Sequence, residues 1–374
     1  MRIVNVSIVQ IVILFENLRN LILDALTKLL WRKNDLLNIK RILIYRVGNI
    51  GDVVVAIPSI MLIKKAYPEA EIIFLSSPGN RGAPGAKQVF EKLEIFSEII
   101  EYYLDDKVSL YQLAKNHKSL QNIDLIIDLP SQFETFRSCL KRMVFMKYLN
   151  SKGAFGWEIS TSKVFRRIQN SYRDFPYEKD RLTKLVATQL KLDELEVKFD
   201  LTKYNPKRDQ DFKDSNYIVL APGAKRSTNK WNLENFKDIA SYLTLRNFTC
   251  ILIGGKDDSN FAEKIKGKNS KILNLCGKVS IFDSLCILDQ ASLSICLDSG
   301  VQHMSSMVGT PTISIFSSRD FSGKWFPNNQ DDVVLRSSTN CEVCLCEICP
   351  YDNKCINSIS PEAVKKVLYD RFRI

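Results

Sequence analysis

The sequence of 374 residues lacks any run of the ~18–20 apolar residues that a membrane-spanning helix needs. Its most apolar segment, residues 8–31, is interrupted by polar and charged side chains. That segment also lacks the clean apolar core and the small-residue cleavage site of a secretory signal. We therefore expect a cytoplasmic protein, with peripheral contact at the inner face of the membrane left open.

Two nucleotide-binding fingerprints are also missing. The glycine-bearing turn at residues 47–52 has the pattern GxxG followed by Asp, not the GxGxxG or GxxxxGK[ST] patterns. The missing GxGxxG argues against an NAD-dependent dehydrogenase. We find no nucleic-acid-binding module either, and the basic residues are spread along the chain. The net charge of +11 instead suits an anionic membrane surface, a phosphorylated glycolipid or a sugar nucleotide.

Apolar runs alternate with helical patterns along the whole chain. Strands are predicted at residues 41–46, 71–75, 123–129, 217–221, 249–253 and 291–296. Helices are predicted at residues 53–65, 233–243, 305–311 and 361–372. We therefore predict an α/β protein with two Rossmann-like doubly wound domains. Their predicted bounds are 38–205 and 206–374, with a polar linker at residues 203–209.

Three segments place chemically useful residues at the ends of predicted strands. Asp52 lies between strand 41–46 and helix 53–65, where open α/β sheets hold catalytic groups and where an acid also caps a helix. Residues 222–231 form a small-residue turn and a basic loop, in which Lys230 can neutralise a diphosphate. A solvated surface loop is the alternative for that segment. From the residues alone, both roles stay open for each.

The third segment, Leu297 to Met304, brings an acid, a hydroxyl, a glycine and a histidine to a strand-to-helix junction. A helix N-terminus offers free N–H groups and a positive dipole end, which suit a phosphate or diphosphate. The alternatives are that Asp298 and Ser299 only cap the helix and that His303 only packs in the core.

Five segments in order resemble the bacterial heptosyltransferases of glycosyltransferase family 9. They are residues 41–72, 123–138, 220–231, 297–316 and 341–364, and the resemblance extends from about Lys40 to Val367. It implies the two-domain GT-B architecture, with the domains facing a cleft and the final helix crossing back onto the first domain. It also implies a metal-independent, inverting glycosyltransferase without a cofactor.

The resemblance further implies the substrates and their residues. The donor is a nucleotide sugar, ADP-heptose, and the acceptor is a lipopolysaccharide-core or other lipid-linked glycan. Asp52 would be the general base on the acceptor hydroxyl. The donor-side residues would be Gly223, Ala224, Lys230, Asp298, Ser299, Gly300 and His303. Gly51 and Arg137 would lie on the acceptor side, although a surface charge is the simpler interpretation of Arg137.

The sequence leaves two alternatives to this enzyme. A non-catalytic nucleotide- or glycan-binding relative of the same fold is disfavoured, because Asp52, Lys230 and Asp298 are all present. A metal-dependent enzyme with a DxD site is disfavoured, because the one DxD, Asp209 to Asp211, lies in the predicted linker rather than at a strand end.

Residues 1–37 precede the usual start of the family. Apolar side chains recur at helical spacing and form one stripe: Ile11, Leu14, Phe15, Leu18, Ile22, Ala25, Leu26 and Leu29. This amphipathic helix either packs on the protein or lies in a membrane interface. In the second case the cations at the headgroups would be Arg19, Lys28, Arg32 and Lys33.

The segment 341–355 is rich in cysteine. Cys341, Cys344, Cys349 and Cys355 match a pattern of the family, and Cys346 is additional. No metal is implied by that resemblance. The spacing leaves open a zinc or iron–sulfur site at these four residues, and free thiols or local disulfides are the alternative.

Overall fold

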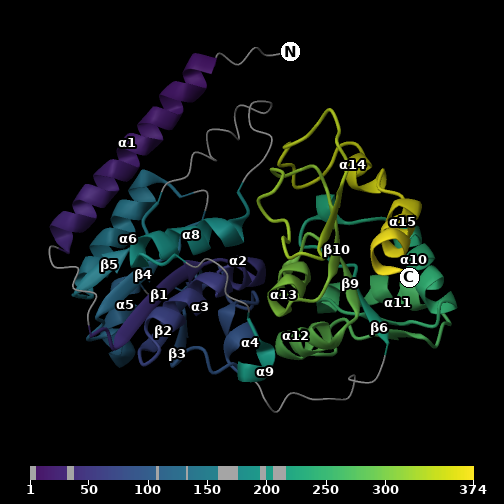
Figure 1. Ribbon diagram of the computed structural model, residues 1–374, viewed down its shortest axis with the longest axis horizontal. Helices are drawn as coiled ribbons and strands as arrows, with labels where there is room; N and C mark the ends of the chain where they lie inside the picture. The colour runs from purple at the N-terminus through teal and green to yellow at the C-terminus, as the bar shows by residue number, and fades with distance from the viewer. Residues whose placement is uncertain are drawn as a thin grey trace. The chain divides into compact units, whose positions relative to one another are not determined.

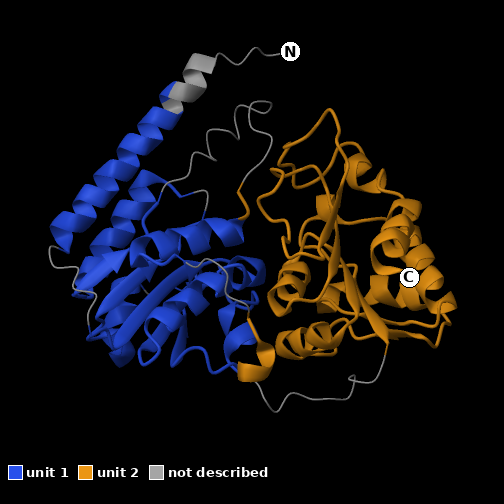
Figure 2. Ribbon diagram, in the orientation of Figure 1, with its two compact units in different colours: residues 1–172, 178–197 blue, residues 173–177, 198–374 orange. Residues whose placement is uncertain are grey.

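A computed structural model describes residues 6–31, 38–106, 109–131, 134–158, 176–193, 199–204 and 216–374. The chain divides into two compact units, residues 1–172 with 178–197 and residues 173–177 with 198–374 (Figure 2). The predicted boundary at 205/206 and the DxD at 209–211 lie outside the described residues. Each unit is described separately below.

Unit 1 contains a five-stranded parallel sheet in the order β3-β2-β1-β4-β5 (Figure 1). Its strands are β1 (Arg41–Val47), β2 (Glu71–Ser77), β3 (Glu98–Glu101), β4 (Leu125–Asp128) and β5 (Gly153–Phe155). Its helices are α1 (Val6–Leu30), α2 (Ile50–Val54), α3 (Ile57–Ala66), α4 (Ala86–Phe90), α5 (Leu110–Asn116), η1 (Lys118–Leu120), α6 (Phe136–Tyr148) and α8 (Glu178–Leu190). The central strands are apolar runs because both faces of a parallel sheet are covered.

The single helix predicted at residues 53–65 is two helices, so this prediction is wrong in detail. The first, α2, begins at Ile50 and ends at Val54, and the second, α3, begins at Ile57. Pro58 stands in the first turn of α3, where its missing N–H needs no partner. The same ring would break a helix that ran through it, so the chain ends one helix and starts another. The earlier start brings Asp52 into the first turn of α2.

Unit 2 contains a six-stranded parallel sheet in the order β11-β10-β9-β6-β7-β8. Its strands are β6 (Tyr217–Ala221), β7 (Thr249–Leu252), β8 (Ile272–Asn274), β9 (Leu293–Leu297), β10 (Thr312–Phe316) and β11 (Val333–Arg336). Its helices are α9 (Leu201–Tyr204), η2 (Ser227–Asn229), α10 (Leu233–Leu245), η3 (Lys256–Asp258), α11 (Ser259–Lys266), α12 (Ile281–Gln290), α13 (Gly300–Val308), α14 (Lys354–Asn357) and α15 (Pro361–Phe372). Two Rossmann-like α/β units were predicted, and both are present.

The final helix, α15, packs within unit 2, so the expectation that it crosses onto the first domain is wrong. Val364 and Leu368 are buried in the same apolar cluster as the facing side chains of α10. Lys365 pairs with Asp238 of α10 at 2.6 Å, and the hydroxyl of Tyr242 donates to the carbonyl of Ile374. The apolar stripe of α15 is therefore fully used inside its own unit.

The N-terminal helix α1 packs on unit 1 beside α6 (Figure 1), but of the predicted stripe only Leu26 is half-buried in that contact. Its buried side chains include Leu23 and Trp31, whereas Ile11, Leu14, Phe15, Leu18, Ile22 and Leu29 are exposed. Arg32 and Lys33 lie outside the described residues. Among the helices that the structure describes, none is both long and apolar enough to cross a membrane.

Candidate functional site

The strand order of unit 1 reverses between β1 and β4, which are neighbours in the sheet. In open α/β sheets, ligands bind beyond the carboxyl ends of the strands at such a point. Asp52 follows β1, and the segment Leu129 to Ser131 follows β4. The reversal therefore brings the predicted base and the loop after β4 to one place.

The carboxylate of Asp52 is held by its own turn. Its Oδ2 accepts a hydrogen bond from the backbone N–H of Asn49 at 3.0 Å, which closes the start of α2. Gly48 has φ +147°, and a Cβ at this position would collide with the side chain of Asp52. The glycine is needed for both the backbone geometry and the close approach. The N-cap residue of α2 is Asn49 rather than Asp52, and Asp52 completes a capping box from the first turn. This fixes the orientation of its carboxylate, and that role is compatible with catalysis.

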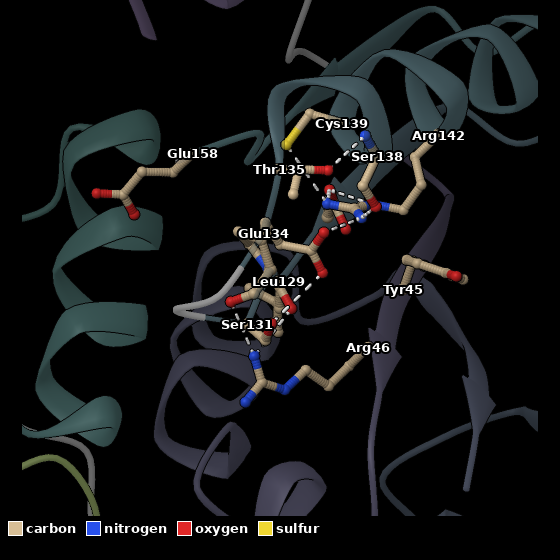
Figure 3. A network of polar contacts seen from close by, with 12 residues as sticks. Tyr45, Arg46, Leu129, Ser131, Glu134, Thr135, Ser138, Cys139, Arg142 and Glu158 are labelled. Atoms are coloured by element: carbon tan, nitrogen blue, oxygen red, sulfur yellow. Dashed lines mark hydrogen bonds and ion pairs between the residues drawn. The ribbon is translucent and has the colours of Figure 1, made fainter. Parts of the chain in front are cut away.

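A fully buried guanidinium, that of Arg46 on β1, ties the two loops together. Figure 3 shows its hydrogen bond to the carbonyl of Leu129. Its Nε donates to the carbonyl of Asp52 at 2.9 Å. Its Nη1 donates to the carbonyls of Leu129 and Pro130, and its Nη2 pairs with Glu178 of α8 at 3.1 Å. Because burial excludes water from these contacts, the arginine acts as a rigid bracket between the base-bearing turn and the loop after β4.

A second arginine, Arg181 of α8, reinforces the bracket. It pairs with Glu178 at 2.9 Å and with Glu158 at 2.8 Å, and it donates to the carbonyl of Pro130. Sequence reasoning did not identify Arg46, Glu178 or Arg181. Arg46 carried a weak signal, since it is a charge at the end of the predicted strand 41–46, directly after an apolar run. Its partner Glu178 comes from a distant segment, and no spacing rule links the two.

Another buried ion cluster lies at the end of β4 (Figure 3). Arg142 of α6 pairs with Asp128 at 2.9 Å and with Glu134 at 2.7 Å. Burial raises the pKa of Asp128 above its ordinary value, although Arg142 opposes that shift. Breaking such a pair would leave a buried charge without compensation. The cluster thus anchors α6 to the sheet.

The two predicted acceptor-side residues occupy different surroundings in unit 1. Gly51 is half-buried in α2, directly before Asp52. Arg137 is exposed on α6 and lines a pocket of about 510 Å³ between α5 and α6. Tyr111, Val144 and Phe145 make that pocket largely apolar, and its other cations include Lys141 of α6. It could receive a ligand with an apolar part and an anionic group.

Unit 2 has its own reversal of strand order, between β6 and β9. A hydrogen bond joins the segments that follow these two strands: Nδ2 of Asn229 donates to Oδ2 of Asp298 at 2.8 Å. The hydroxyl of Ser317, after β10, donates to Oδ1 of Asn229 at 2.6 Å. The loop after β6 and the predicted DSG segment after β9 are therefore brought together. Asn229 and Ser317 were not predicted.

Asp298 is electrostatically unusual. Burial raises its pKa to about 6, and the nearby carboxylate of Asp320 adds to that rise. Arg226, Arg319 and the hydrogen bond from Asn229 oppose the shift. Strongly perturbed carboxyl groups at the end of a strand are typical of functional sites.

The hydroxyl of Ser299 does not cap α13, although Ser299 stands at the N-cap position. Its Oγ is buried and has no hydrogen-bond partner among the residues that the structure describes. One turn on, Gln302 is fully buried, and both atoms of its amide also lack a partner within those residues. Such groups cost about 1–3 kcal/mol each when left unsatisfied. Together with the helix dipole beginning at Gly300, they indicate a polar ligand at this helix start.

His303 is buried on α13, and burial lowers its pKa to about 4. The imidazole is therefore neutral at physiological pH. Its ring packs against the edge of Trp325, with the centroids 5.8 Å apart. The ammonium group of Lys324, itself buried, lies 4.8 Å from the centroid of the same tryptophan ring. A buried lysine close to the helix start was not predicted from the sequence.

The small residues after β6 have structural roles of their own. A Cβ at Gly223 would collide with the carboxylate of Asp258, which accepts from the N–H of Gly255 at 2.9 Å. Ala224 is buried in the apolar cluster of unit 2. Lys230, by contrast, is exposed at the end of η2. Of these three predicted donor residues, Lys230 has the side chain best placed to meet a ligand.

The cysteines at 341–355 are all free thiols. Cys355 is buried in α14, and the other four are partly exposed. In the described part of the chain, no three His, Cys, Asp or Glu side chains lie close enough to hold a metal ion. A metal site at Cys341, Cys344, Cys349 and Cys355 stays an alternative to free thiols. Backbone turns at Val343 and Leu345, both with positive φ, separate the thiols.

Comparisons with known proteins identify relatives over most of the chain. The family model of glycosyltransferase family 9 (heptosyltransferase) matches residues 110–355. Lipooligosaccharide heptosyltransferase 2 of Campylobacter jejuni is 25% identical over 324 residues, which cover 84% of this chain and 93% of that protein. Lipopolysaccharide heptosyltransferase 3 of Escherichia coli is 24% identical over 301 residues, which cover 72% of this chain and 81% of that protein.

Solved structures give the same architecture. Heptosyltransferase WaaC of E. coli with ADP-2-deoxy-2-fluoro heptose matches with a TM-score of 0.64 and 17% identity, covering 88% of this chain and 99% of that one. E. coli ADP-heptose lps heptosyltransferase II matches with a TM-score of 0.61 and 16% identity, covering 88% and 97%. At these identities the matches show the fold, which is of the GT-B class, as predicted.

Proposed function

The chain belongs to glycosyltransferase family 9, and from that premise we propose that it transfers heptose from ADP-heptose to a lipopolysaccharide-type or other lipid-linked glycan. Membership of the family makes it a glycosyltransferase and confirms the resemblance found in the sequence. The names of the relatives from C. jejuni and E. coli support heptose as the sugar. The ADP-sugar analogue held by WaaC supports ADP-heptose as the donor.

The observation that carries the donor site is the start of α13. Ser299 and Gln302 bring polar groups there that lack partners among the described residues. A diphosphate and a sugar would supply the missing hydrogen bonds, and the helix dipole would stabilise the charge that develops on the leaving ADP. We assign Lys230 to the diphosphate, and neutral His303 and Asp298 to hydrogen bonds with the donor. Gly223, Ala224 and Gly300 would contribute backbone groups.

In this proposal Asp52 is the general base. It would accept the proton of the acceptor hydroxyl while that oxygen forms a bond to the anomeric carbon and ADP leaves. One displacement inverts the configuration at that carbon. The hydrogen bond from Asn49 and the close contact with Gly48 support the assignment, because they fix the carboxylate before the acceptor binds. The scheme needs no metal ion.

The acceptor is assigned to unit 1. The pocket between α5 and α6 combines apolar walls with Arg137 and Lys141, which suits an amphiphilic acceptor that carries negative charge. Gly51 has no side chain, so it leaves space beside Asp52. An acceptor of this kind is embedded in a membrane, so we propose that the protein works at the cytoplasmic face of the membrane as a peripheral protein.

A donor screen tests the proposed function. The purified protein would be assayed by thermal shift and by transfer to heptose-deficient lipopolysaccharide, using ADP-heptose, ADP-glucose, UDP-glucose and GDP-mannose. We expect stabilisation by both ADP-sugars and transfer from ADP-heptose alone, unchanged by EDTA. Transfer from a different nucleotide sugar would refute heptose, and loss of activity in EDTA would refute the metal-independent scheme. Binding without any transfer would favour a non-catalytic role.

A further inference from the structure

One face of the helix α1 packs on the rest of unit 1, and the opposite face is exposed. Successive residues of a helix are rotated by about 100°, so Glu16, Asn20, Leu23, Thr27 and Trp31 share one face. These residues are buried or half-buried against unit 1. The face on the other side of the helix carries Ile11, Leu14, Phe15, Leu18, Leu21, Ile22, Ala25 and Leu29. Every one of those side chains is exposed.

Specific contacts fix which face points outward. Trp31 stacks on Trp157 with ring centroids 5.1 Å apart, and its Nε1 donates to the hydroxyl of Ser151 at 3.0 Å. Lys147 of α6 donates to the carbonyl of Leu30 at 2.7 Å. Leu23 is fully buried in the apolar cluster of unit 1. Because these contacts hold the C-terminal half of α1, the helix cannot turn its apolar stripe inward without breaking them.

The outward stripe is the largest concentration of exposed apolar side chains in the described part of the chain. Seven of the eighteen large hydrophobic residues that are exposed there belong to the stripe, and Leu14 and Leu21 are 67% and 66% exposed. Isolated exposed apolar residues need no explanation, but a contiguous set does. The stripe therefore indicates a partner.

The width of the stripe distinguishes a lipid surface from a second helix. Ile11, Phe15, Leu18, Ile22, Ala25 and Leu29 follow the alternating spacing of four and three residues that is found in a coiled-coil seam. Leu14 and Leu21, however, stand on the flank of that seam, where coiled coils usually place charged residues. An apolar face this broad suits the interface of a bilayer.

The charge of the neighbouring helix indicates which lipids the stripe would meet. Over its whole length α6 carries four cations and no acidic residue. Three of those cations, Arg137, Lys141 and Lys147, are exposed. The fourth, Arg142, is buried and forms ion pairs with Asp128 and Glu134. Figure 1 shows α6 lying alongside α1. Each basic residue near an anionic bilayer contributes about 1 kcal/mol of attraction.

We propose that the outward stripe of α1, together with the cationic helix α6, is a docking surface for an anionic lipid bilayer. The apolar side chains of α1 would enter the headgroup region while the helix lies flat on the membrane. Its opposite face stays bound to unit 1. Docking in this manner would hold unit 1, to which we assign the acceptor, at the membrane.

A triple variant tests this proposal in the full-length chain. Leu14→Gln, Leu18→Gln and Leu21→Gln remove the centre of the stripe without touching the face bound to unit 1. The matched control replaces three apolar residues exposed elsewhere, Leu104→Gln, Leu245→Gln and Ile348→Gln. The wild type and both variants would be sedimented with phosphatidylglycerol vesicles and with phosphatidylcholine vesicles, at low and high salt, and their thermal unfolding would be measured in parallel.

We expect the wild type and the control to bind phosphatidylglycerol vesicles, more weakly at high salt, and the α1 variant to bind at least about tenfold more weakly. The melting temperatures of all three should agree. Equal binding by the α1 variant, or no binding by the wild type, would overturn the proposal. A wild-type dimer that becomes a monomer in the α1 variant would assign the stripe to a second copy instead. None of these readouts depends on transferase activity, so they are independent of the proposed function.

Discussion

The buried polar groups at the carboxyl edges of the two sheets differ in how many of them have partners. At the edge of unit 1, buried arginines and carboxylates satisfy one another: Arg46 and Arg181 share Glu178, and Arg142 joins Asp128 to Glu134. At the edge of unit 2, the hydroxyl of Ser299 and the amide of Gln302 are buried without partners among the described residues. The exceptions at this edge of unit 1, again among the described residues, are one oxygen of Asp128, the hydroxyl of Ser76 at the end of β2 and the indole N–H of Trp157 after β5.

The two edges are therefore suited to different roles in the proposed reaction. An internally satisfied ionic network makes a rigid frame, which suits a catalytic base that must be oriented before the substrate arrives. Buried polar groups that lack partners make a site whose hydrogen bonds are completed by a ligand. The network of unit 1 thus suits a fixed orientation of Asp52, and the polar groups of unit 2 suit the binding of a nucleotide sugar. Four predictions test this contrast, from the largest expected effect to the smallest.

The largest effect is expected at the base. Asp52→Asn should lower kcat by at least about a hundredfold, the scale of lost general-base catalysis, while the fold is kept. A matched control is Asp283→Asn, because Asp283 has the same capping role at α12, where its Oδ2 accepts from the N–H of Ser280 at 3.1 Å. Purified variants would be compared by transfer rate and melting temperature. Similar transfer rates for the two would reduce Asp52 to a helix cap.

A smaller effect is expected from the frame. Arg46→Lys keeps the charge but loses the fork that reaches Asp52, Leu129 and Glu178, so the base should shift and kcat should fall roughly thirtyfold. Arg41→Lys is the control, since Arg41 lies at the other end of β1. The KM for the donor, which is assigned to unit 2, should stay constant in both. A changed donor KM with normal kcat in the Arg46 variant would contradict the assigned role.

The pKa shifts of unit 2 predict two opposite dependences of stability on pH. Asp298 has a folded pKa of about 6, above its unfolded value, so its contribution to stability is complete at about pH 4 and is lost as pH rises through 6. His303 has a folded pKa of about 4, below its unfolded value, so its contribution grows between pH 4 and about 6.5. In wild type the two trends partly cancel.

Single variants should separate these trends. Asp298→Asn should gain stability more steeply than wild type as pH rises from 4 to 7, and His303→Gln should gain it less steeply. Each change should be on the order of 2–3 kcal/mol across that range. Urea denaturation at several pH values would measure both. If the curves of both variants run parallel to that of wild type, the two groups are not perturbed as described.

The smallest effect is expected from a single hydroxyl. Ser299→Ala should weaken ADP binding by about threefold to fivefold and leave the melting temperature unchanged, because this serine does not cap its helix. Ser280→Ala removes a true cap, which accepts from the N–H of Asp283 at 3.0 Å. It should therefore cost about 1 kcal/mol of stability and leave ADP binding intact. An exchange of the two outcomes would show that Ser299 is structural.

Much of the fold followed from the sequence because the buried strands are continuous apolar runs. β6 and α15 have the predicted bounds, and β1 ends one residue beyond its prediction. Periodicity also found the stripe of α1, but it could not tell which way the stripe faces, since exposure depends on contacts such as that of Trp31 with Trp157. The break between α2 and α3 was missed because Pro58 was placed inside one helix.

The candidate site was predicted only where its residues are adjacent in sequence. Asp52 and the DSG segment stand at strand ends and could be found by spacing. The bond from Asn229 to Asp298 and the bracket from Arg46 to Glu178 join segments far apart in the chain. Only the strand order of each sheet brings those segments together. Lys324 and Gln302 were not predicted, because the residues around them in the sequence do not indicate that they are buried.

The central claim is that donor binding resides in unit 2 and the base in unit 1, and ADP titration of two variants tests it most directly. Isothermal calorimetry should give Asp52→Asn the same affinity for ADP as wild type, and Lys230→Ala an affinity about tenfold lower. The exposed Lys268→Ala would be the control for lost surface charge. Unchanged affinity in Lys230→Ala, together with a large loss in Asp52→Asn, would contradict the division of roles between the two units.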